Sequence, residues 1–339
     1  MKVVTFGELM LKLSPVSYQR FVQATLMKLE YAGAEANVAV SLANFGLDSV
    51  FVSKLPNNDF GKAAINAIRH YGVDTEKVVR GGERIGIYFA EKGASQRPSK
   101  VIYDRKGSAI ACATITDFDW NSIFEGVHWF HFTGITPSLS DSLATICLEA
   151  CKMAKTKGIT ISCDLNYRRK LWTHQHAREV MTKLCQYVDI CIANEEDAAD
   201  VFGIKAKNSD VNKGIINEQS YGLVAQELQR QFGFQKVAIT LRESISASDN
   251  KWSAILYDGA HVYTSRKFAI HLVDRIGSGD SFGAGLIYGL SHYDDLQKAL
   301  DFAVAASCMK HTIEGDFNLV SVAEVEDLIN GDASGRVKR

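Results

Sequence analysis

From Val127 onward the sequence alternates between short β-type runs and helical segments, and this alternation restricts the chain to few architectures. Helices are expected over 140–157, 173–186 and 223–232, with another from Glu195. The β-type runs between and beside them read VHWFHFTG, ITISCDLN, VDICIAN, VAITLR and WSAILYD. Such an alternation predicts a mainly parallel, doubly wound sheet with helices on both faces. Polar residues that follow the strands should then converge on a ligand crevice at one edge of the sheet.

The first third of the chain departs from this alternation. Residues 2–6 predict a first strand, and helices are expected over 35–45, closed by Gly46, and over 60–71, stopped by Gly72. The β-type segments within 9–31 and 84–105 have no helices to cover them. We expect these segments to form one small β-sheet, a lid over the crevice that is discontinuous in sequence. Residues 1–339 would then be a single α/β domain carrying this lid.

The charge balance argues against large anionic partners. Lysines and arginines number 38 against 39 acidic residues, a formal net charge of −1. Nucleic acids and membrane surfaces usually require a basic excess, so neither is expected as a partner. No apolar run approaches the ~20 residues that a membrane span needs. The seven cysteines form no C-x-x-C pair and lie mostly in apolar stretches, which indicates reduced thiols in a cytoplasmic protein.

The segment 274–286, DRIGSGDSFGAGL, has the chemistry of an anion site with a base beside it. Gly277, Ser278 and Gly279 allow backbone N–H groups to converge where a helix begins, and the helix dipole adds positive potential. Asp280 is poorly suited to bind an anion, but it is well placed to accept the proton of a hydroxyl that attacks a phosphate. The alternative is a glycine-rich turn before a packed helix, with Asp280 as an ordinary first-turn acid.

Other polar residues lie near the start of a helix or the end of a strand. In AGAEANVAV, Gly33 would let a ligand approach the backbone and Asn37 offers a donor and an acceptor to a hydroxyl. The alternative is a glycine hinge into a buried helix. Asn166 and Arg168 follow a strand in DLNYR, where Arg168 is a bidentate partner for carboxylate or phosphate, or forms a surface salt bridge. Asn194 ends the next strand.

Several nucleotide-binding classes lack their motifs here. The only Gly-Lys pair, Gly61-Lys62, has neither the upstream glycine nor the hydroxyl residue of a P-loop. The H-R-D element of protein kinases is missing, and no dinucleotide fingerprint follows the first strand. His128 and His131 are three residues apart on a strand and point to opposite faces, so we interpret them as packing residues, not metal ligands.

The segment 274–286 resembles the signature D-T-x-G-A-G-D-x-F-x-x-G of the ribokinase-like (PfkB) carbohydrate kinases. It matches at Asp274, Gly277, Gly279, Asp280, Phe282 and Gly285. Residues 32–39 resemble the family's N-terminal G-G-x-x-x-N-x-A motif, with Ala32 in place of the first glycine. The resemblance implies a ribokinase-like fold, ATP and Mg²⁺ as cofactors, Asp280 as the catalytic base, and room for a monovalent cation near Asp274.

The same resemblance assigns the nucleotide and metal ends of the site. Asn194 and Asp197 correspond to the family's N-x-x-E, which helps to hold Mg²⁺ through water, with aspartate where glutamate is usual. In the family's T-x-G-x-x-G turn, Thr240 fits but Arg242 and Ile245 occupy glycine positions, so Arg242 either pairs with phosphate or faces solvent. The residues implied at the nucleotide are Asn166, Arg168, Asn194, Thr240, Arg242, Gly277 and Gly279.

Within the family, segments such as GELMLKLSP, DLNYRRKLW and KHTIEGDFNLVS look most like 2-keto-3-deoxygluconate kinases. This likeness implies phosphorylation of the primary hydroxyl of a small sugar acid. The substrate residues implied are Gly33, Asn37, Tyr88, Tyr103, Arg105, Arg168 and Asp280. A fructokinase or ribokinase acting on a neutral sugar, and a non-catalytic sugar-binding regulator, remain alternatives. The edge strands of the lid predict a homodimer or a multiple of dimers.

Overall fold

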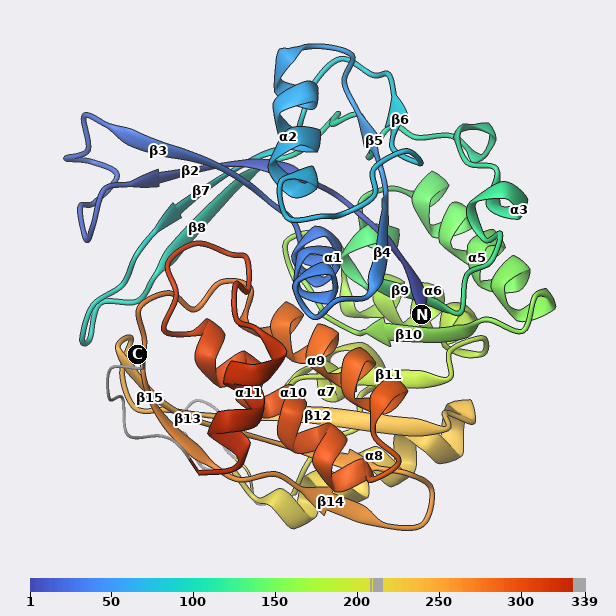
Figure 1. Ribbon diagram of the computed structural model, residues 1–339, viewed down its shortest axis with the longest axis vertical. Helices are drawn as coiled ribbons and strands as arrows, with labels where there is room; N and C mark the ends of the chain where they lie inside the picture. The colour runs from blue at the N-terminus through green and yellow to red at the C-terminus, as the bar shows by residue number, and fades with distance from the viewer. Residues whose placement is uncertain (208, 210–215, 332–339) are drawn as a thin grey trace.

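The computed structural model describes residues 1–207, 209 and 216–331, which form one large and two small β-sheets with helices around them (Figure 1). The nine-stranded main sheet has the order β14-β13-β12-β11-β10-β9-β1-β4, with β15 also paired to β13. Its strands are β1 (Lys2–Phe6), β4 (Asp48–Val52), β9 (Trp129–Thr133), β10 (Thr160–Asp164), β11 (Ile190–Ala193), β12 (Lys236–Ser244), β13 (Asp249–Tyr257), β14 (Val262–Thr264) and β15 (Phe268–His271).

Strand direction divides the main sheet into two parts. From β4 to β12 every neighbouring pair is parallel, whereas β13 is antiparallel to β12, β14 and β15. The mainly parallel sheet predicted from the sequence is therefore confirmed, with WSAILYD as an antiparallel exception. The link between β12 and β13 is too short for a crossover helix, so it can only form a hairpin. The strand order reverses at β1, where the carboxyl ends of the strands open a crevice.

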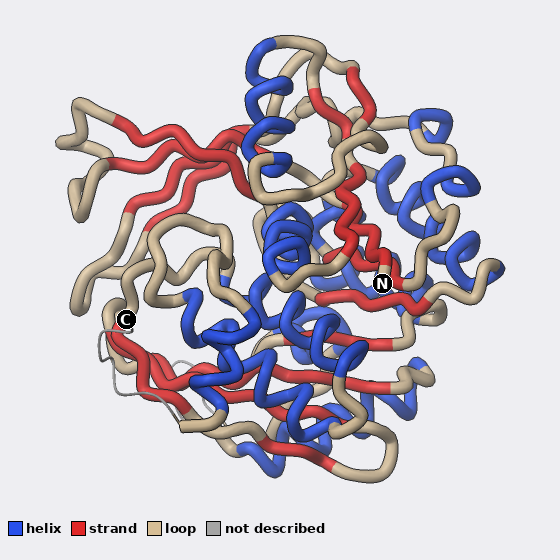
Figure 2. Tube along the Cα trace, viewed as in Figure 1, coloured by secondary structure: helices blue, strands red, loops and turns tan. Residues whose placement is uncertain are grey.

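Helices cover both faces of the main sheet (Figure 2). The successive residues Val3 and Val4 of β1 point into different cores, as alternation along a strand requires. One core is built with α5 (Asp141–Thr156), α6 (His174–Cys185) and α8 (Glu218–Phe232), and the other with α1 (Ala34–Asn44), α9 (Ser278–His292), α10 (Leu296–Lys310) and α11 (Val322–Ile329). The described residues also form α2 (Asp59–Arg69), α3 (Trp120–Ile123), α4 (Ile135–Ser138), α7 (Asp197–Phe202) and a short 3-10 helix, Ile115–Asp117.

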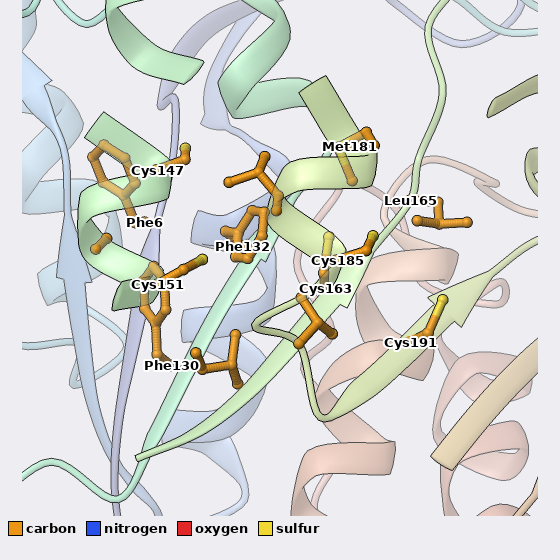
Figure 3. Packing of buried hydrophobic residues seen from close by; sticks show 14 of the residues in the cluster. Phe6, Phe130, Phe132, Cys147, Cys151, Cys163, Leu165, Met181, Cys185 and Cys191 are labelled. Carbon is orange, nitrogen blue, oxygen red and sulfur yellow. The ribbon is translucent and has the colours of Figure 1, made fainter. Parts of the chain in front are cut away.

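The first core contains most of the cysteines. Figure 3 shows Cys147 of α5 near Phe6 of β1 and Cys151 near Phe130 of β9. All seven cysteines of the chain are free, and five of them are buried; Cys112 is exposed and Cys308 is intermediate. Burial raises the pKa of the Cys147 thiol well above its usual range. These thiols behave as small apolar side chains that pack the core.

The two β-type excursions of the first third form one small sheet, as predicted. This small sheet has the order β3-β2-β7-β8, with β2 (Met10–Pro15), β3 (Met27–Ala32), β7 (Ile87–Glu91) and β8 (Lys100–Asp104). The parallel β2–β7 pair joins the two excursions, which are distant in sequence. Figure 1 shows the small sheet projecting from the main body. A two-stranded sheet of β5 (Lys54–Leu55) and β6 (Val79–Arg80) lies beside α2.

Two boundaries differ from the sequence expectation. Helix α8 begins at Glu218 instead of residue 223, because the Asn217 side chain accepts a hydrogen bond from the Ser220 amide and caps the helix. Residues 208 and 210–215, which precede this helix, lie outside the described residues. Helix α7 begins at Asp197, not Glu195. In the described part of the chain no helix is long and apolar enough to cross a membrane.

Candidate active site

A cavity of about 390 Å³ opens between the small sheet and the carboxyl ends of the central strands. All the residues expected at the site except Asp197 line it, although they come from distant parts of the chain. The lining residues from the main body are Gly33, Asn37, Asn166, Arg168, Asn194, Thr240, Arg242, Gly277, Ser278, Gly279 and Asp280, and those from the small sheet and its edge are Tyr88, Tyr103 and Arg105. The topological rule for parallel strands accounts for this convergence.

Asp280 lies in the first turn of α9 and is held by Asn37 of α1. The Asn37 amide nitrogen donates to Oδ2 of Asp280 at 2.6 Å, while the Asn37 oxygen accepts from the Gly33 amide at 3.4 Å. Burial raises the pKa of Asp280 from 3.8 to about 6, and the Asn37 hydrogen bond opposes that shift. The carboxyl group is thus oriented, and its pKa is near the range in which a general base works at neutral pH.

The turn before α9 requires glycine at Gly277. Gly277 has φ +83°, and a Cβ there would clash with the Asp316 carbonyl oxygen. A Cβ at Gly279 would meet no atom within 4 Å, because that position faces open space. The Ser278 hydroxyl donates to the Arg275 carbonyl at 2.9 Å. The amides of the first helical turn have no intrahelical partner, so they are available to an anion in the cavity.

Gly33 lines the cavity and is also required for packing. A Cβ at Gly33 would clash with the Glu8 carbonyl oxygen, so glycine is needed for the chain to pack against itself. The next residue but one, Glu35, is buried and accepts hydrogen bonds from the Thr133 amide and hydroxyl and from the Thr136 hydroxyl. Burial raises the pKa of Glu35 to about 7. These bonds fix the start of α1, and with it Asn37, against β9.

The aromatic wall of the cavity comes from the small sheet. The Tyr88 and Tyr103 rings stack with their centroids 6.0 Å apart, and the Arg105 guanidinium lies 4.2 Å from the centroid of the Tyr103 ring. The Tyr88 hydroxyl donates to Asp316, whose other oxygen accepts from the Lys12 ammonium at 2.6 Å. Asp316 therefore ties two strands of the small sheet to the segment after α10.

Arg105 has a carboxylate partner that sequence reasoning missed. Its Nε lies 3.5 Å from Oε2 of Glu8, and both side chains are almost fully buried. Arg105 is therefore not an unpaired cation. Burial raises the pKa of Glu8, and the Arg105 charge opposes this shift. Nε and Nη1 of Arg105 still have no hydrogen-bond partner, so the guanidinium retains donors for a ligand.

Arg168 and Asp164 lie between the two ends of the cavity. Nη1 of Arg168 donates to the Tyr167 carbonyl at 3.0 Å, and Asn166, which has φ +39°, donates from its side chain to Asp164 at 3.4 Å. Burial raises the pKa of Asp164 well above its usual range, and the nearby Asp197 and Asp280 carboxylates add to the shift. A cation in this part of the cavity would relieve that repulsion.

The far end of the cavity is basic. Nη2 of Arg242 lies 3.2 Å from Oε1 of the buried Glu195 in the cavity wall, and 35% of the Arg242 side chain remains exposed. Arg275 lines the same end, and burial together with the Arg242 charge lowers its pKa. Nε of each arginine is buried without a hydrogen-bond partner. Two such guanidinium groups suit the phosphates of a nucleotide.

Comparisons with known proteins agree with this geometry. The model of the pfkB family carbohydrate kinases matches residues 1–319. The chain belongs to the PfkB family. It is similar to the crystal structure of a 2-dehydro-3-deoxygluconokinase from Thermotoga maritima, with 52% identity, a TM-score of 0.94 and coverage of 98% of this chain and 100% of that one. It is also 32% identical to a 2-dehydro-3-deoxygalactonokinase of Haloferax volcanii, over 98% of each chain.

A more distant solved structure agrees in fold. It is a putative ribokinase II from E. coli in complex with ATP and Mg²⁺, with 21% identity, a TM-score of 0.80 and coverage of 97% of this chain and 99% of that one. Membership of the PfkB family makes the chain a carbohydrate kinase with the ribokinase-like fold. The roles of individual side chains in this PfkB kinase are proposed below.

The metal assignment of Asp197 disagrees with its surroundings. Its two carboxylate oxygens accept from the Tyr167 and Asn194 amides, each at 2.9 Å, and the residue does not line the cavity. We therefore assign Asp197 to joining the loops after β10 and β11. Among the described residues no group of three or more His, Cys, Asp or Glu side chains could hold a metal. Asp164 and Asn194 do line the cavity, and Mg²⁺ needs few protein ligands because it keeps several waters.

Histidine packing follows the sequence interpretation. Nδ1 of His128 accepts from the Lys2 amide at 3.2 Å, and His131 is buried against the Ser162 hydroxyl at 2.8 Å. Burial lowers the pKa of His131 to about 3, so its ring is neutral at physiological pH.

Ile245, like Arg242, occupies a position where the family's nucleotide turn has glycine. Its side chain is exposed and does not line the cavity.

Sequence reasoning missed several charged residues at this site. Glu8 and Asp164 each follow or end a central strand, and that position is a signal that could have identified them. Lys12, Asp316 and Lys310 carry no comparable local signal. Their proximity to the cavity depends on how the small sheet and the end of α10 pack against the turn before α9.

Proposed function

We propose that this PfkB kinase transfers the γ-phosphoryl group of ATP to the primary hydroxyl of a small sugar acid. The proposed substrate is 2-keto-3-deoxygluconate, and the product is 2-keto-3-deoxy-6-phosphogluconate. One observation carries the proposal: a single cavity contains a base beside a helix N-terminus together with two arginines, Arg105 and Arg168. A base with an anion site suits phosphoryl transfer, and the arginines suit a carboxylate at the other end of the acceptor.

The reacting end depends on Asp280 and the turn before it. Asp280 accepts the hydroxyl proton as the oxygen attacks, while Asn37 holds the carboxyl group in position. The amides of Gly277, Ser278 and Gly279 stabilise the negative charge on the transferring group. Bound Mg²⁺ would neutralise charge on the phosphates, and Asp164 and Asn194 would hold it through water.

The nucleotide end rests on Arg242, Arg275 and Thr240. In the family, glycines of this turn let the backbone contact the phosphates of ATP. Here the guanidinium groups of Arg242 and Arg275 would contact the phosphates instead, and the Nε atom of each has no hydrogen-bond partner. Thr240 donates its hydroxyl to the Ala193 carbonyl at 3.4 Å and forms part of the wall there. ATP as the phosphoryl donor is supported by family membership and by the ATP complex of the distant relative.

The sugar-acid end rests on Arg105 and Arg168. Glu8 already balances the charge of Arg105, so a neutral sugar would not leave that cation unpaired. The argument for an acid is instead that two buried donors of Arg105, Nε and Nη1, have no partner. A substrate carboxylate would supply charge-assisted acceptors for them, and the hydroxyls of a neutral sugar would supply weaker ones.

The test is an ADP-release assay over a panel of acceptors. The panel contains 2-keto-3-deoxygluconate, its C4 epimer 2-keto-3-deoxygalactonate, fructose and ribose. We expect activity on the acids, and the ratio of kcat/KM for the two epimers then defines the specificity at C4. Preference for fructose or ribose would identify a neutral-sugar kinase. Absence of ADP release with every acceptor would favour a non-catalytic sugar-binding regulator.

A variant links the acid preference to the cavity. Arg105→Ala should lower kcat/KM for 2-keto-3-deoxygluconate by ~1.5–3 kcal/mol, the contribution of a charged hydrogen bond, with a smaller loss on fructose. Arg97→Ala is the matched control, because Arg97 is also attached to the small sheet but pairs with Glu91 outside the cavity. Equal losses on both substrates with Arg105→Ala would contradict the role of Arg105 in acid recognition.

We further propose a homodimer in the cytoplasm. The connection between β2 and β3 exposes large apolar side chains, among them Val22 at 89% and Leu26 at 67% exposed. The outer edges of β3 and β8 have no partner strand within the described chain. A second copy would cover both features. The seven free cysteines support the assignment to a reducing compartment.

A further inference from the structure

Lys310, the last residue of α10, is a charged side chain with no exposed surface. Its ammonium donates to the main-chain carbonyls of Asp274 at 3.4 Å and Ile313 at 3.3 Å. No carboxylate oxygen of the described residues lies within 4.0 Å of this nitrogen. Burying a charge without a counter-ion is costly, so a lysine at such a position requires a reason.

The ammonium lies against the backbone that carries the anion-binding turn. The Val273 and Asp274 amides both donate to the His311 carbonyl, at 2.9 and 3.2 Å, and the Ser307 hydroxyl donates to the Ser278 carbonyl at 2.7 Å. The turn before α9 therefore rests on the end of α10. Lys310 adds a positive charge beside this turn, although it does not itself line the cavity.

The electrostatic surroundings suit a monovalent cation. Carbonyl oxygens contact the ammonium, and the C-terminal end of α10 supplies the negative pole of its dipole. Burial lowers the pKa of Lys310, the carboxylates of Asp274, Asp316 and Asp280 oppose that shift, and the Lys12 ammonium adds to it. The expected free cation near Asp274 does not fit this arrangement, because Lys310 already occupies the carbonyls there.

We propose that the Lys310 ammonium is a built-in monovalent cation that positions and charges the anion-binding turn, so that catalysis requires no free K⁺ or Na⁺. The proposal rests on the kinase activity proposed above. Lys310 acts through the turn and does not contact the substrate, so it is a positioning residue. Its positive charge strengthens the binding of the transferring phosphoryl group by the amides of the turn. Because the ammonium is part of the chain, it cannot dissociate as a free ion would.

The first test uses the wild-type enzyme and needs no variant. ADP release is measured with Mg²⁺ in a tetramethylammonium buffer, and again after replacement by K⁺, Na⁺ or NH₄⁺ at equal ionic strength. We expect the same kcat in all four. A wild type that is active only with K⁺ or Na⁺ overturns the proposal but leaves the kinase function intact, whereas inactivity in every buffer on every sugar contradicts the kinase function itself.

The second test removes the ammonium. Lys310→Ala should lower kcat by roughly 10²–10³-fold, the range found when an electrostatic contact to a reacting oxyanion is lost, with a smaller change in KM. K⁺, NH₄⁺ or ethylammonium, each able to enter the vacated space, should restore part of the loss. Lys298→Ala is the control, because Lys298 lies on the same helix but is exposed and far from the cavity lining.

Two results with the variant would refute the role of Lys310. One is a Lys310→Ala enzyme with wild-type kcat, and the other is a folded variant whose loss no cation restores, since a merely structural lysine would behave in that way. Folding is checked by the melting temperature. Should Lys310→Ala not fold, the ion series on the wild type still decides the proposal.

Discussion

The bond between Asn37 and Asp280 makes a quantitative prediction about pH dependence. Asp280 must be ionised to accept the hydroxyl proton, so kcat should be constant above its pKa and fall about tenfold for each pH unit below it. With a pKa of about 6, the acid limb of the wild-type profile is expected near pH 6. Replacing Asn37 by alanine removes a donor to the charged form, and the pKa of Asp280 must then rise.

The size of the shift follows from the geometry of the bond. A hydrogen bond of 2.6 Å to a carboxylate contributes about 1.5–3 kcal/mol, and each pKa unit corresponds to about 1.36 kcal/mol. Complete loss of the bond would thus raise the pKa by about 1–2 units. Water can enter the open cavity and replace part of the lost bond, so we expect the lower value, about one unit. The acid limb of Asn37→Ala should therefore move to near pH 7.

The assay is kcat at saturating sugar acid and ATP, measured from pH 5 to 9 by ADP release. Saturation matters because Asn37 is also proposed to contact the substrate, and a changed KM must not be mistaken for a changed pKa. Asn44→Ala is the matched control: Asn44 ends the same helix, and its amide donates to the Asn318 carbonyl outside the cavity. An acid limb of Asn37→Ala that stays in place, or moves to lower pH, would refute the reasoning.

Three further predictions concern the base, the turn and the small sheet. Asp280→Asn should lower kcat by roughly 10²–10⁴-fold, and calorimetry at pH 7 should show a higher melting temperature. Burial raises the pKa of Asp280 from 3.8 to about 6, so the folded state holds the ionised carboxylate less favourably than the unfolded state does. Above pH 6 this lowers the free energy of unfolding by up to about 3 kcal/mol, and below pH 3.8 the effect is absent. Near-normal kcat would rule out Asp280 as the base. Gly279→Ala should keep the melting temperature but lower kcat, because the added methyl group fills the anion site. Gly277→Ala should lower the melting temperature, because Gly277 has a positive φ and a Cβ there clashes with Asp316. A larger loss of melting temperature in Gly279→Ala than in Gly277→Ala would contradict the assignment of the turn. Light scattering should show a dimer or a multiple of dimers, and Val22→Asp should favour smaller species; a monomer at micromolar concentration counts against the proposed dimer.

Charge pairing across the cavity bears on substrate selection. Glu8 faces Arg105, Glu195 faces Arg242, and Asp316 faces Lys12. Each of these cations is therefore largely neutralised before any ligand binds. The selectivity of the site should depend less on its net charge than on which donors are left without partners, and this is why the donors of Arg105 are the decisive ones.

Sequence alone determined the class of fold and identified the turn with Asp280 that lines the cavity. Strand and helix periods are local properties, so the alternation after Val127 was sufficient to predict the main sheet. The glycines around Asp280 constrain the backbone within a few residues, and the position of Asn194 at a strand end places it at the crevice by topology. Even the small sheet was predictable, because two uncovered β segments have few other ways to bury their apolar faces.

Only the tertiary structure determined the partners of the charged groups. Glu8 meets Arg105 because the small sheet returns to the end of β1, and Lys310 meets the Asp274 carbonyl because α10 packs beneath the turn before α9. The Asp197 carboxylate accepts hydrogen bonds from two backbone amides, although its spacing from Asn194 suggested a metal role. The physical reason is that a charge can be buried only where opposite charges or hydrogen-bond partners converge on it. That convergence is set by long-range packing, which leaves no local pattern in the sequence.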